Sequence, residues 1–592
     1  MTADVRGTAA PPRFGPVPVA GGTLFQLWAP QAGTVELEIE GAAPRCMEAA
    51  GEGHYRLQAP AAPGTAYRFR VDGRAVPDPA SHGQRDEPDG WSLVPGRYRP
   101  PGRRRSRPWH ESVLAEIHVG AATVEGTFRA LIDRLDHYRD AGFTVLELMP
   151  VAAFAGRWNW GYDGVLPYAP DRSYGTPAEL RALVDAAHAR GLSMMLDVVY
   201  NHFGPAGDFL PFYAGVFYRD DMPTPWGPAI NLENPTVRAF FVENAQHWLR
   251  HFDFDGLRFD AVHAFTTAGA QTLLRELAAG CRAVKPDAFL VLENHDNVAG
   301  WLTQGERLYT AQWNDDWHHV AHHIATGEAR GYYAPYAADP VGGIGRALAE
   351  GFVFQGEPYP GPLDAPRGTA SGHLRPDAFV SFVQNHDHIG NRPFGDRLTA
   401  SVPAERLALL HFVLMLAPSI PLLFMGEEAG LATPFPFFCD FGGALADAVR
   451  TGRRAEFRAF FDDCDAHAEM PPDPLAAETF QAAKLRVEAF DTAGARTALA
   501  AFRDLAAKRR RLVWPLAASG FTDAVAERRG GTLAVRWQAP AGALLLVLNP
   551  TDTPAAAGCP DRAPDASVGT VARAGSGIAL GAFSAALWSL MR

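Results

Sequence analysis

From about residue 112 the chain repeats one pattern, a short apolar segment followed by a longer stretch with helical spacing. Strands that alternate with helices favour a parallel sheet, and eight strands are the number that closes a (β/α)8 barrel. Eight segments have the length and apolar content of buried strands, namely residues 113–119, 144–149, 193–200, 256–261, 289–293, 308–313, 379–384 and 421–425. The sequence therefore predicts an α/β fold organised around a TIM barrel.

One connecting helix shows its boundaries in the sequence. Thr176 stands where an N-cap is expected, Pro177 follows at the first helical position, and Glu179 lies three residues after the cap. This is the pattern of a capping box. Apolar residues then recur at helical spacing until Gly191, which predicts the end of the helix.

The chain has 592 residues, more than one ordinary domain requires. Val35, Leu37 and Ile39 alternate with glutamates, which predicts strands with one solvated face. We expect residues 1–100 to form an N-terminal immunoglobulin-like β-sandwich, similar to a carbohydrate-binding module. Residues 97–108 are expected to be a linker. The barrel is assigned to residues 101–515, with a loop subdomain at 203–234, and a C-terminal β domain to residues 516–592.

Composition excludes several classes of partner. The net charge of −12 and the isoelectric point near 5.9 argue against nucleic acid and against an anionic membrane surface. The longest apolar run, residues 409–425, contains two prolines and is too short to span a bilayer. The five cysteines are scattered and form no C-x-x-C pair. We therefore predict a reduced, cytoplasmic protein without a membrane segment.

Polar side chains gather where several predicted strands end, which is the face that carries chemistry in such barrels. In an extended segment Arg258 and Asp260 point to the same side, so a guanidinium lies beside a carboxylate. An isolated pair of this kind is usually a buried structural ion pair. Here Glu293 and Asp387 follow other strands, and two carboxyls about 5 to 5.5 Å apart are what a retaining glycosidase requires.

The segments DVVYNH, GLRFDAVH, VLEN and FVQNHD resemble the four signature regions of the α-amylase superfamily, in the same order. Within it the chain resembles the maltooligosyltrehalose trehalohydrolase family, through NWGYDGVLPYAP, QWNDDWHH and PFPFFCDF among others. This resemblance implies a retaining glycoside hydrolase. It would cleave the α-1,4-glucosidic bond next to the terminal trehalose of maltooligosyltrehalose and release trehalose and maltooligosaccharide, in trehalose biosynthesis, without a cofactor or metal.

The resemblance also implies roles for individual residues. Asp260 resembles the nucleophile, kept anionic by Arg258, and Glu293 resembles the acid/base. Glu293 must hold a proton, so we expect its pKa to be raised, in part by the neighbouring Asp260. Asp387 resembles the third carboxylate, which supports the distorted sugar ring. The expected substrate-binding residues are Tyr162, His202, Arg258, His386, Asp315, Asp316 and Trp317, and Asp197 and Asn201 are expected to have structural roles near the site.

Some assignments stay open at this stage. Residues His318, His319, His322 and His323 have the spacing of paired metal ligands, but they are better interpreted as a wall of the sugar cleft or as helix histidines with ordinary partners. The segment after Glu293 lacks an arginine that would help to bind substrate, which leaves the preferred chain length undefined.

The four motifs do not decide the linkage, so a glycogen debranching or branching enzyme acting on α-1,6 bonds is an alternative. A non-catalytic carbohydrate-binding barrel is an alternative of another class, disfavoured because all three carboxylates are present. The family resemblance implies maltooligosyltrehalose and related α-glucans as ligands. It also suggests maltooligosyltrehalose synthase as a pathway partner.

Overall fold

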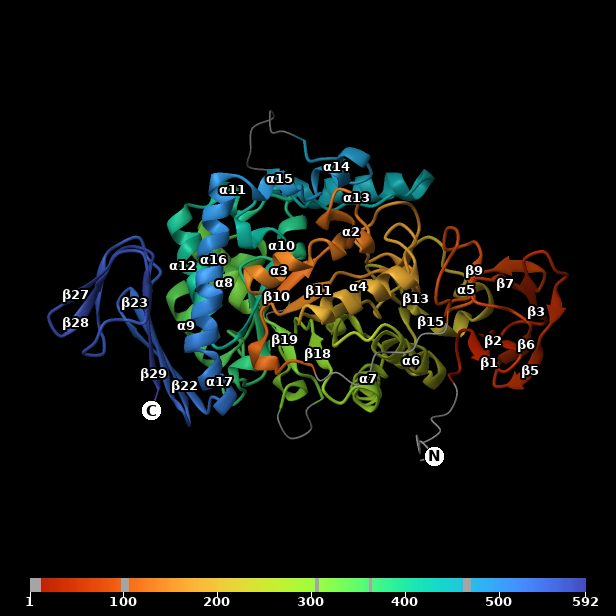
Figure 1. Cartoon of the computed structure of the whole chain (residues 1–592), viewed down its shortest axis with the longest axis horizontal. Coiled ribbons are helices and arrows are strands. Elements are labelled where there is room, and N and C mark those ends of the chain that lie inside the picture. The colour runs from red at the N-terminus through yellow and green to blue at the C-terminus, as the bar shows by residue number, and fades with distance from the viewer. Residues whose placement is uncertain (1–11, 97–105, 304–307, 361–364, 462–469, 592) are drawn as a thin grey trace.

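The computed structural model describes residues 12–96, 106–303, 308–360, 365–461 and 470–591. Its centre is a closed barrel of eight parallel strands, in chain order around the ring (Figure 1). The strands are β10 (Leu114–Ile117), β11 (Val145–Leu148), β14 (Ser193–Val198), β17 (Gly256–Phe259), β18 (Phe289–Leu292), β19 (Ala311–Trp313), β20 (Phe379–Phe382) and β21 (Ile420–Phe424). The predicted TIM barrel is confirmed.

Seven of the eight predicted segments each contain one barrel strand that is shorter than predicted, and the eighth, 421–425, is shifted one residue towards the C-terminus relative to β21. The prediction overran mostly at the carboxyl ends, where polar residues leave the ladder and turn into the loops of the mouth. The ring closes through parallel pairing of β10 with both β11 and β21.

Helices connect most of these strands and surround the barrel (Figure 1). The predicted capping box is present in α4, where Thr176 accepts from the Glu179 amide and the Glu179 side chain accepts from the Thr176 amide. The longer helices are α4 (Pro177–Ala189), α6 (Pro235–His251), α7 (Ala270–Val284), α8 (Asp315–Thr326), α9 (Pro340–Glu350), α12 (Ala404–Leu416), α13 (Gly443–Phe461) and α16 (Ala493–Leu512).

Two antiparallel sheets precede the barrel and lie at one end of the molecule (Figure 1). One consists of β1 (Val17–Val19), β2 (Gly22–Trp28), β6 (His54–Ala59) and β5 (Glu48–Gly51). The other consists of β4 (Arg45–Cys46), β3 (Val35–Ile39), β7 (Ala66–Val71) and β8 (Arg74–Val76), with β9 (Ser92–Leu93) paired to β7. The predicted alternation is confirmed in β3 and β7, whose solvated faces pair Glu38 with Arg68 and Arg70.

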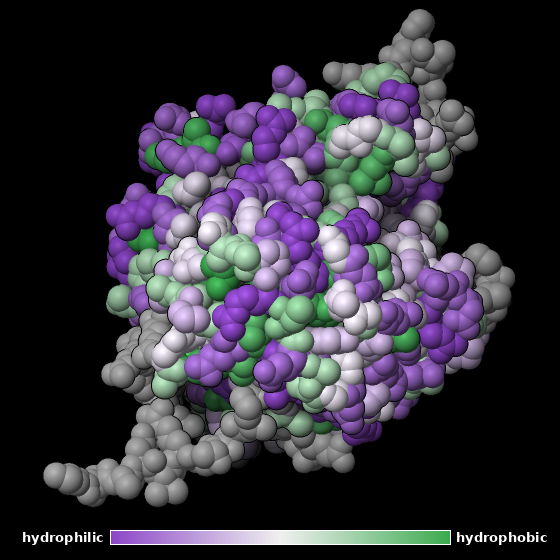
Figure 2. All heavy atoms as spheres, turned by 90° about the vertical axis from the view of Figure 1, so that its right-hand side faces the viewer, coloured by the Kyte–Doolittle hydropathy of each residue, from purple (hydrophilic) through white to green (hydrophobic). Residues whose placement is uncertain are grey.

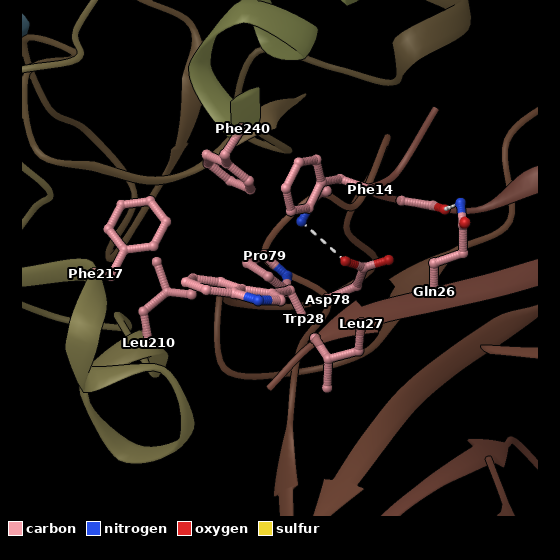
Figure 3. Close-up of a pocket in the computed structure, with 11 residues that line it drawn as sticks. Phe14, Gln26, Leu27, Trp28, Asp78, Pro79, Leu210, Phe217 and Phe240 are labelled. Carbon is pink, nitrogen blue, oxygen red and sulfur yellow. Dashed lines mark hydrogen bonds between the residues drawn. The ribbon is translucent and has the colours of Figure 1, made fainter. Parts of the chain in front are cut away.

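Aromatic packing joins these sheets to the barrel loops (Figure 3). Phe14 meets Phe240 of α6 edge to face at 5.2 Å, and Trp28 lies 6.4 Å from Phe217. The space left among these side chains is about 10 Å³, and Asp78 lies at its edge with an oxygen bonded to the Ala80 amide. A space of this size holds about one water molecule, so this junction is packed rather than open.

The predicted loop subdomain follows β14. Its residues form α5 (Leu210–Tyr213) and a hairpin of β15 (Tyr218–Thr224) and β16 (Gly227–Ile230). Trp226 lies at the turn of this hairpin and is 48% exposed. The subdomain also touches the N-terminal sheets, since the Gln31 amide donates to the Tyr213 carbonyl.

Two further antiparallel sheets end the chain on the opposite side of the barrel (Figure 1). Trp537 of β23 is buried against α9 and donates from Nε1 to the Leu348 carbonyl at 3.0 Å. The five-stranded sheet contains β22 (Asp523–Arg529), β23 (Thr532–Ala539), β24 (Gly542–Asn549), β29 (Ser584–Met591) and β26 (Ala566–Val568). The three-stranded sheet contains β25 (Ala555–Gly558), β28 (Gly577–Leu580) and β27 (Val571–Ala574).

Figure 2 shows the end of the molecule that carries the N-terminal sheets, where hydrophilic residues predominate and hydrophobic ones occur in small groups. Within the described ranges, no helix has the length and apolar character needed to cross a bilayer. Of the five cysteines, Cys464 lies outside the described residues, and the other four are free.

Candidate active site

The barrel ladder fixes two of the predicted acids just beyond the strand ends. The Asp260 amide donates to the carbonyl of Val198 at 3.1 Å, and the Glu293 amide donates to the carbonyl of Phe259 at 3.0 Å. Each acid therefore sits one residue past its strand, on backbone that the neighbouring strand still holds. The two side chains start from adjacent strands, β17 and β18, at the carboxyl-terminal mouth of the barrel.

Arg258 is the centre of the site. Its Nη1 donates to Asp260 Oδ1 and to Asp197 Oδ2, both at 2.7 Å, and its Nη2 donates to Glu293 Oε2 at 2.9 Å. The guanidinium is completely buried and lies over the ring of Trp313, with Cζ 4.2 Å from the ring centroid. One cation therefore holds three carboxylates in place.

Binding to the same guanidinium limits the separation of Asp260 and Glu293. The two terminal nitrogens of a guanidinium are roughly 2.3 Å apart, so the two bonded oxygens lie within about 8 Å of each other. This range includes the separation at which one carboxyl attacks a sugar while the other protonates the leaving oxygen.

The backbone after Asp260 is itself specialised. Ala261 has a left-handed conformation, with φ 39° and ψ 49°, which residues other than glycine rarely adopt. This turn directs the Ala261 amide at Glu293, whose Oε2 accepts it at 2.7 Å. Local strain thus supplies a donor that fixes the second acid.

The electrostatics of the two acids differ from the sequence-based expectation. Burial raises the pKa of Asp260 well above its ordinary value, and the charges of Glu293 and Asp197 add to this although Arg258 opposes it. Burial also acts on Glu293, but Arg258 and the Ala261 amide are among the groups that together hold its pKa below the ordinary value. In this conformation the pKa of Asp260 is therefore raised and that of Glu293 is lowered.

The directions of these two pKa shifts are opposite to the expected anionic Asp260 and raised pKa of Glu293. The reason is the sharing of Arg258, which the sequence does not reveal. Asp260 and Asp197 each accept a hydrogen bond from Nη1 of that guanidinium. Glu293 accepts hydrogen bonds from the other terminal nitrogen of Arg258 and from a backbone amide. His263 also acts to lower its pKa.

Three further residues predicted for the site lie together at the mouth of the barrel, next to Asp197. They are Tyr162, His386 and Asp387. The ring of Tyr162 stacks on His386 at 5.1 Å, and its hydroxyl donates to Asp197 Oδ2 at 2.7 Å. Asp387 is partly exposed, and its Oδ1 lies 3.4 Å from Nε2 of His386. Tyr162 and His386 thus form a stacked wall, with Asp387 beside it.

His202 is placed differently from the expectation of a free sugar-binding imidazole. Its Nε2 lies 2.9 Å from the Tyr162 carbonyl and its Nδ1 lies 3.0 Å from Asn201 Oδ1, so both ring nitrogens have protein partners. Its ring stacks on the exposed Trp226 at 5.2 Å. Sequence reasoning missed Trp226, because a single aromatic residue in a loop gives no periodic signal.

The three residues predicted at the start of α8 separate into two groups. Asp315 is partly exposed, and burial together with the charge of Glu293 raises its pKa to about 8. Asp316 is fully buried and accepts from the amides of Val353 and Phe354, so it anchors a loop. Trp317 is buried in the core. The prediction that Asp316 and Trp317 bind substrate is therefore wrong, because the helix turns both side chains inward.

Three charged residues at the site were not predicted. Glu116 of β10 binds His386, and Glu147 of β11 is buried below the carboxylates with neither oxygen hydrogen-bonded. Arg367 donates from Nε to the His295 carbonyl at 2.7 Å, and its charge acts on Asp315. Arg367 comes from the long β19–β20 connection, is buried, and forms an ion pair with Asp316 at 3.1 Å. The two glutamates had a signal, since each is a charge inside an apolar strand.

Two histidines of α8, His318 and His319, contact His388, and three of the four, His318, His322 and His323, have ordinary hydrogen-bond partners. His318 Nδ1 lies 2.7 Å from the Val383 carbonyl, His322 Nε2 lies 2.9 Å from Glu328 Oε2, and His318 stacks on His388 at 3.5 Å. Among the residues that the structure describes, no group of three or more His, Cys, Asp or Glu side chains is arranged to hold a metal ion.

Comparisons with known proteins agree with this geometry. The family model described as alpha amylase, catalytic domain, matches residues 84–211. A malto-oligosyltrehalose trehalohydrolase of Deinococcus radiodurans is 37% identical, over 84% of this chain and 82% of the relative. Another, of Arthrobacter ramosus, is 39% identical over 82% of this chain and 87% of the relative.

Solved structures give the same result. A putative alpha amylase from Salmonella typhimurium superposes with a TM-score of 0.90 at 39% identity, covering 98% of this chain and 100% of that one. A pullulanase from Paenibacillus barengoltzii has a TM-score of 0.69 at 19% identity, over 98% of this chain and 95% of that one, which shows a shared fold alone. The barrel, its four motifs and the near full-length relatives place this chain in the malto-oligosyltrehalose trehalohydrolase family of the α-amylase superfamily.

Proposed function

We propose that this chain hydrolyses the α-1,4-glucosidic bond between a maltooligosaccharide and its terminal trehalose, releasing trehalose. The observation that supports this most is the convergence of Asp260 and Glu293 on one buried arginine at the barrel mouth. The names of the relatives supply the substrate, since the pair of carboxyls alone is compatible with other α-glucans.

In the first proposed step an oxygen of Asp260 attacks the anomeric carbon of the glucose that precedes trehalose. The bond from that carbon to the trehalose oxygen breaks, and Glu293 gives its proton to the departing oxygen. Trehalose leaves, and the maltooligosaccharide stays as an ester of Asp260. In the second step Glu293 takes a proton from water, the water oxygen bonds to the anomeric carbon, and Asp260 is released.

This mechanism requires one proton to move before the first step. In the conformation described above the pKa of Asp260 is raised and that of Glu293 is lowered, while the reaction requires the proton on Glu293. We propose that a sugar between the two acids separates Glu293 from Arg258 and the Ala261 amide. Loss of these two donors raises the pKa of Glu293, and the guanidinium is then left to Asp260 and Asp197. The number of protons in the cluster does not change.

The surrounding residues are proposed to bind the sugar. Tyr162 and Trp226 offer aromatic faces, which suit the apolar face of a glucose ring. His386 and Asp387 are proposed to bind hydroxyls of the sugar at the cleavage point. Asp315, partly exposed and without a hydrogen bond or ion pair to any described residue, is proposed to bind a hydroxyl of the departing trehalose, beside the charge of Arg367.

The test compares three substrates with one enzyme preparation: maltooligosyltrehalose, a plain maltooligosaccharide of equal length, and glycogen. We expect trehalose from the first and little release of sugar from the other two. The matched control is Asp260→Asn, prepared in the same way, which excludes a contaminating hydrolase. Shortened branches from glycogen, or the absence of trehalose with wild-type protein, contradicts the proposal.

Two finer assignments belong to this proposal. The scattered free cysteines favour a reduced compartment, and we propose the cytoplasm. The substrate carries trehalose at one end of a glucan, so an enzyme that builds this end, a maltooligosyltrehalose synthase, is the proposed pathway partner. The domain limits at about residues 100 and 515 are likewise proposed.

A further inference from the structure

His386 has a carboxylate at each of its ring nitrogens. Nδ1 makes a short hydrogen bond with Glu116 Oε1, and Nε2 lies 3.4 Å from Asp387 Oδ1. An ionised carboxylate only accepts hydrogen bonds, so both contacts are favourable only when both ring nitrogens carry hydrogen. With both carboxyls ionised, this geometry favours an imidazolium at His386.

Glu116 is bound so that it cannot turn away. Its Oε2 accepts the main-chain amide of His386 at 3.0 Å while its Oε1 takes the ring, so both oxygens contact the same residue. The carboxyl is 1% exposed and projects from β10, which is paired on both sides in the closed barrel. Being covered by His386, Glu116 does not reach the cleft itself.

We propose that Glu116 is a positioning residue that keeps His386 doubly protonated, so that its Nε2–H is a permanent donor at the Asp387 side of the cleft. That the donor serves a sugar rests on the function proposed above, but the protonation state does not. Without a proton on Nε2, the Glu116 bond would keep hydrogen on Nδ1 and leave a lone pair at Nε2, facing Asp387 and unable to donate to a hydroxyl.

Charged groups on several elements face His386, and they explain its state. Burial alone would lower its pKa, but Asp387 and Glu116 raise it to about 9, with Arg258 opposing them. The other titratable groups that act on it or are influenced by it are His118, Glu147, Asp197, Glu293 and His388. The rings of Tyr162, Trp160 and Trp313 complete the surroundings.

Glu147 provides a matched control. It occupies the position paired with Glu116 on the next strand and is equally buried. Neither of its oxygens has a hydrogen bond, and burial raises its pKa well above the ordinary value, which favours the neutral form. Glu147→Gln therefore changes a buried carboxyl to an amide at the neighbouring register position without removing a charge or a contact with His386.

The first measurement is the titration of His386 in the full-length wild-type chain, by NMR of ring-labelled histidine with His386→Gln to assign the signal. We expect a pKa near 9, and a lower value by about one unit or more in Glu116→Gln. A wild-type pKa at or below 6.5 overturns the proposal, whether or not Glu116→Gln folds and whichever sugar the enzyme cleaves.

The second measurement is the pH profile of kcat/KM for trehalose release. We expect the basic limb of Glu116→Gln to move to lower pH by the same amount as the His386 titration, with activity near pH 6 within about threefold of wild type. Glu147→Gln is expected to keep the wild-type limb. A uniform loss at every pH in folded Glu116→Gln, or an equal shift in both variants, contradicts the proposal. Absence of hydrolysis in the wild type refutes the proposed function. The titration of His386 still tests the role of Glu116 in that case.

Discussion

Two aspartates at opposite ends of β17 have opposite environments. Asp255 precedes the strand at the base of the barrel, and Asp260 follows it at the mouth. Both are buried, with exposed fractions of 2% and 8%. Asp255 has four donors, Lys285 and Ser106 on one oxygen and His188 and the Met194 amide on the other. Asp260 has one donor, Nη1 of Arg258, which also donates to Asp197.

The difference in donors decides the charge of each group. Burial opposes ionisation at Asp255, but His188 and Lys285 outweigh it and hold its pKa far below the ordinary range. At Asp260 burial and the neighbouring carboxylates outweigh Arg258 and raise the pKa. A buried carboxylate with a full set of hydrogen-bond donors stabilises the fold. A buried carboxylate with few donors can still interact with groups that the substrate brings. We therefore expect Asp255 at the base of the barrel to contribute to stability and Asp260 at the mouth to contribute to reactivity.

Asp260→Asn is the change with the largest expected effect. Removing the nucleophile should lower kcat by about 10⁴-fold or more, while the urea-unfolding midpoint should stay at or above that of wild type because one crowded acid is gone. Trehalose release and urea unfolding, measured on the same preparation, test both parts. Near-normal turnover would refute the role of Asp260, and a large loss of stability would break the contrast with Asp255.

Glu293→Gln should have the next largest effect. The amide keeps the size of the side chain and can still accept from Arg258 and the Ala261 amide, but it cannot donate a proton to the departing oxygen. A fall in kcat of about 10²- to 10⁴-fold is expected, the range for a lost general acid. A leaving group that needs no proton, such as a fluoride, should restore much of the first step. If it restores nothing, Glu293 is not the acid.

Asp255→Asn is the matched change at the base. It leaves Lys285 and His188 without their carboxylate, and breaking a buried pair of this kind costs about 3 kcal/mol of unfolding free energy. Activity per folded molecule should remain within about twofold of wild type, because the far end of the strand is untouched. The check is urea unfolding alongside trehalose release. Lost activity at full stability would show that the two ends are coupled.

The sequence was sufficient for the barrel, the capping box of α4 and the location of Asp260 and Glu293 at the carboxyl ends of their strands, because these follow from local periodicity and from strand ends. It was insufficient for their charges. The sharing of Arg258 with Asp197 depends on a third strand, and the Ala261 amide on a left-handed turn. The number of hydrogen-bond donors around each acid depends on the tertiary structure, so local sequence patterns do not reveal it.

The same limit explains the other misplaced residues. Asp315 and Asp316 are neighbours with equal local signals, yet the start of α8 turns the second into the core. Arg367 reaches the site from a connection with no regular pattern, so spacing could not assign it. Glu116 and Glu147 could have been found, because a charge inside a fully apolar barrel strand requires a partner or a proton.

The smallest expected effects are changes in the pH dependence of stability, and they should have opposite signs. The pKa of Asp255 is lowered in the folded state, so its contribution is fully present above the unfolded value of 3.8 and is lost as pH falls below it. The stability deficit of Asp255→Asn should therefore shrink below about pH 4.

The contribution of Asp260 to stability should have the opposite dependence on pH. Its pKa is raised in the folded state, so the folded chain is most favoured below 3.8 and loses stability as pH rises towards the folded pKa. Asp260→Asn lacks this loss, so its stability relative to wild type should grow with pH, by roughly 1 kcal/mol for each unit over the titrating range. Urea unfolding of the three proteins from about pH 3 to about pH 8 measures both slopes. Parallel curves for the two variants would mean that the ends of β17 do not differ in the way that their donors require.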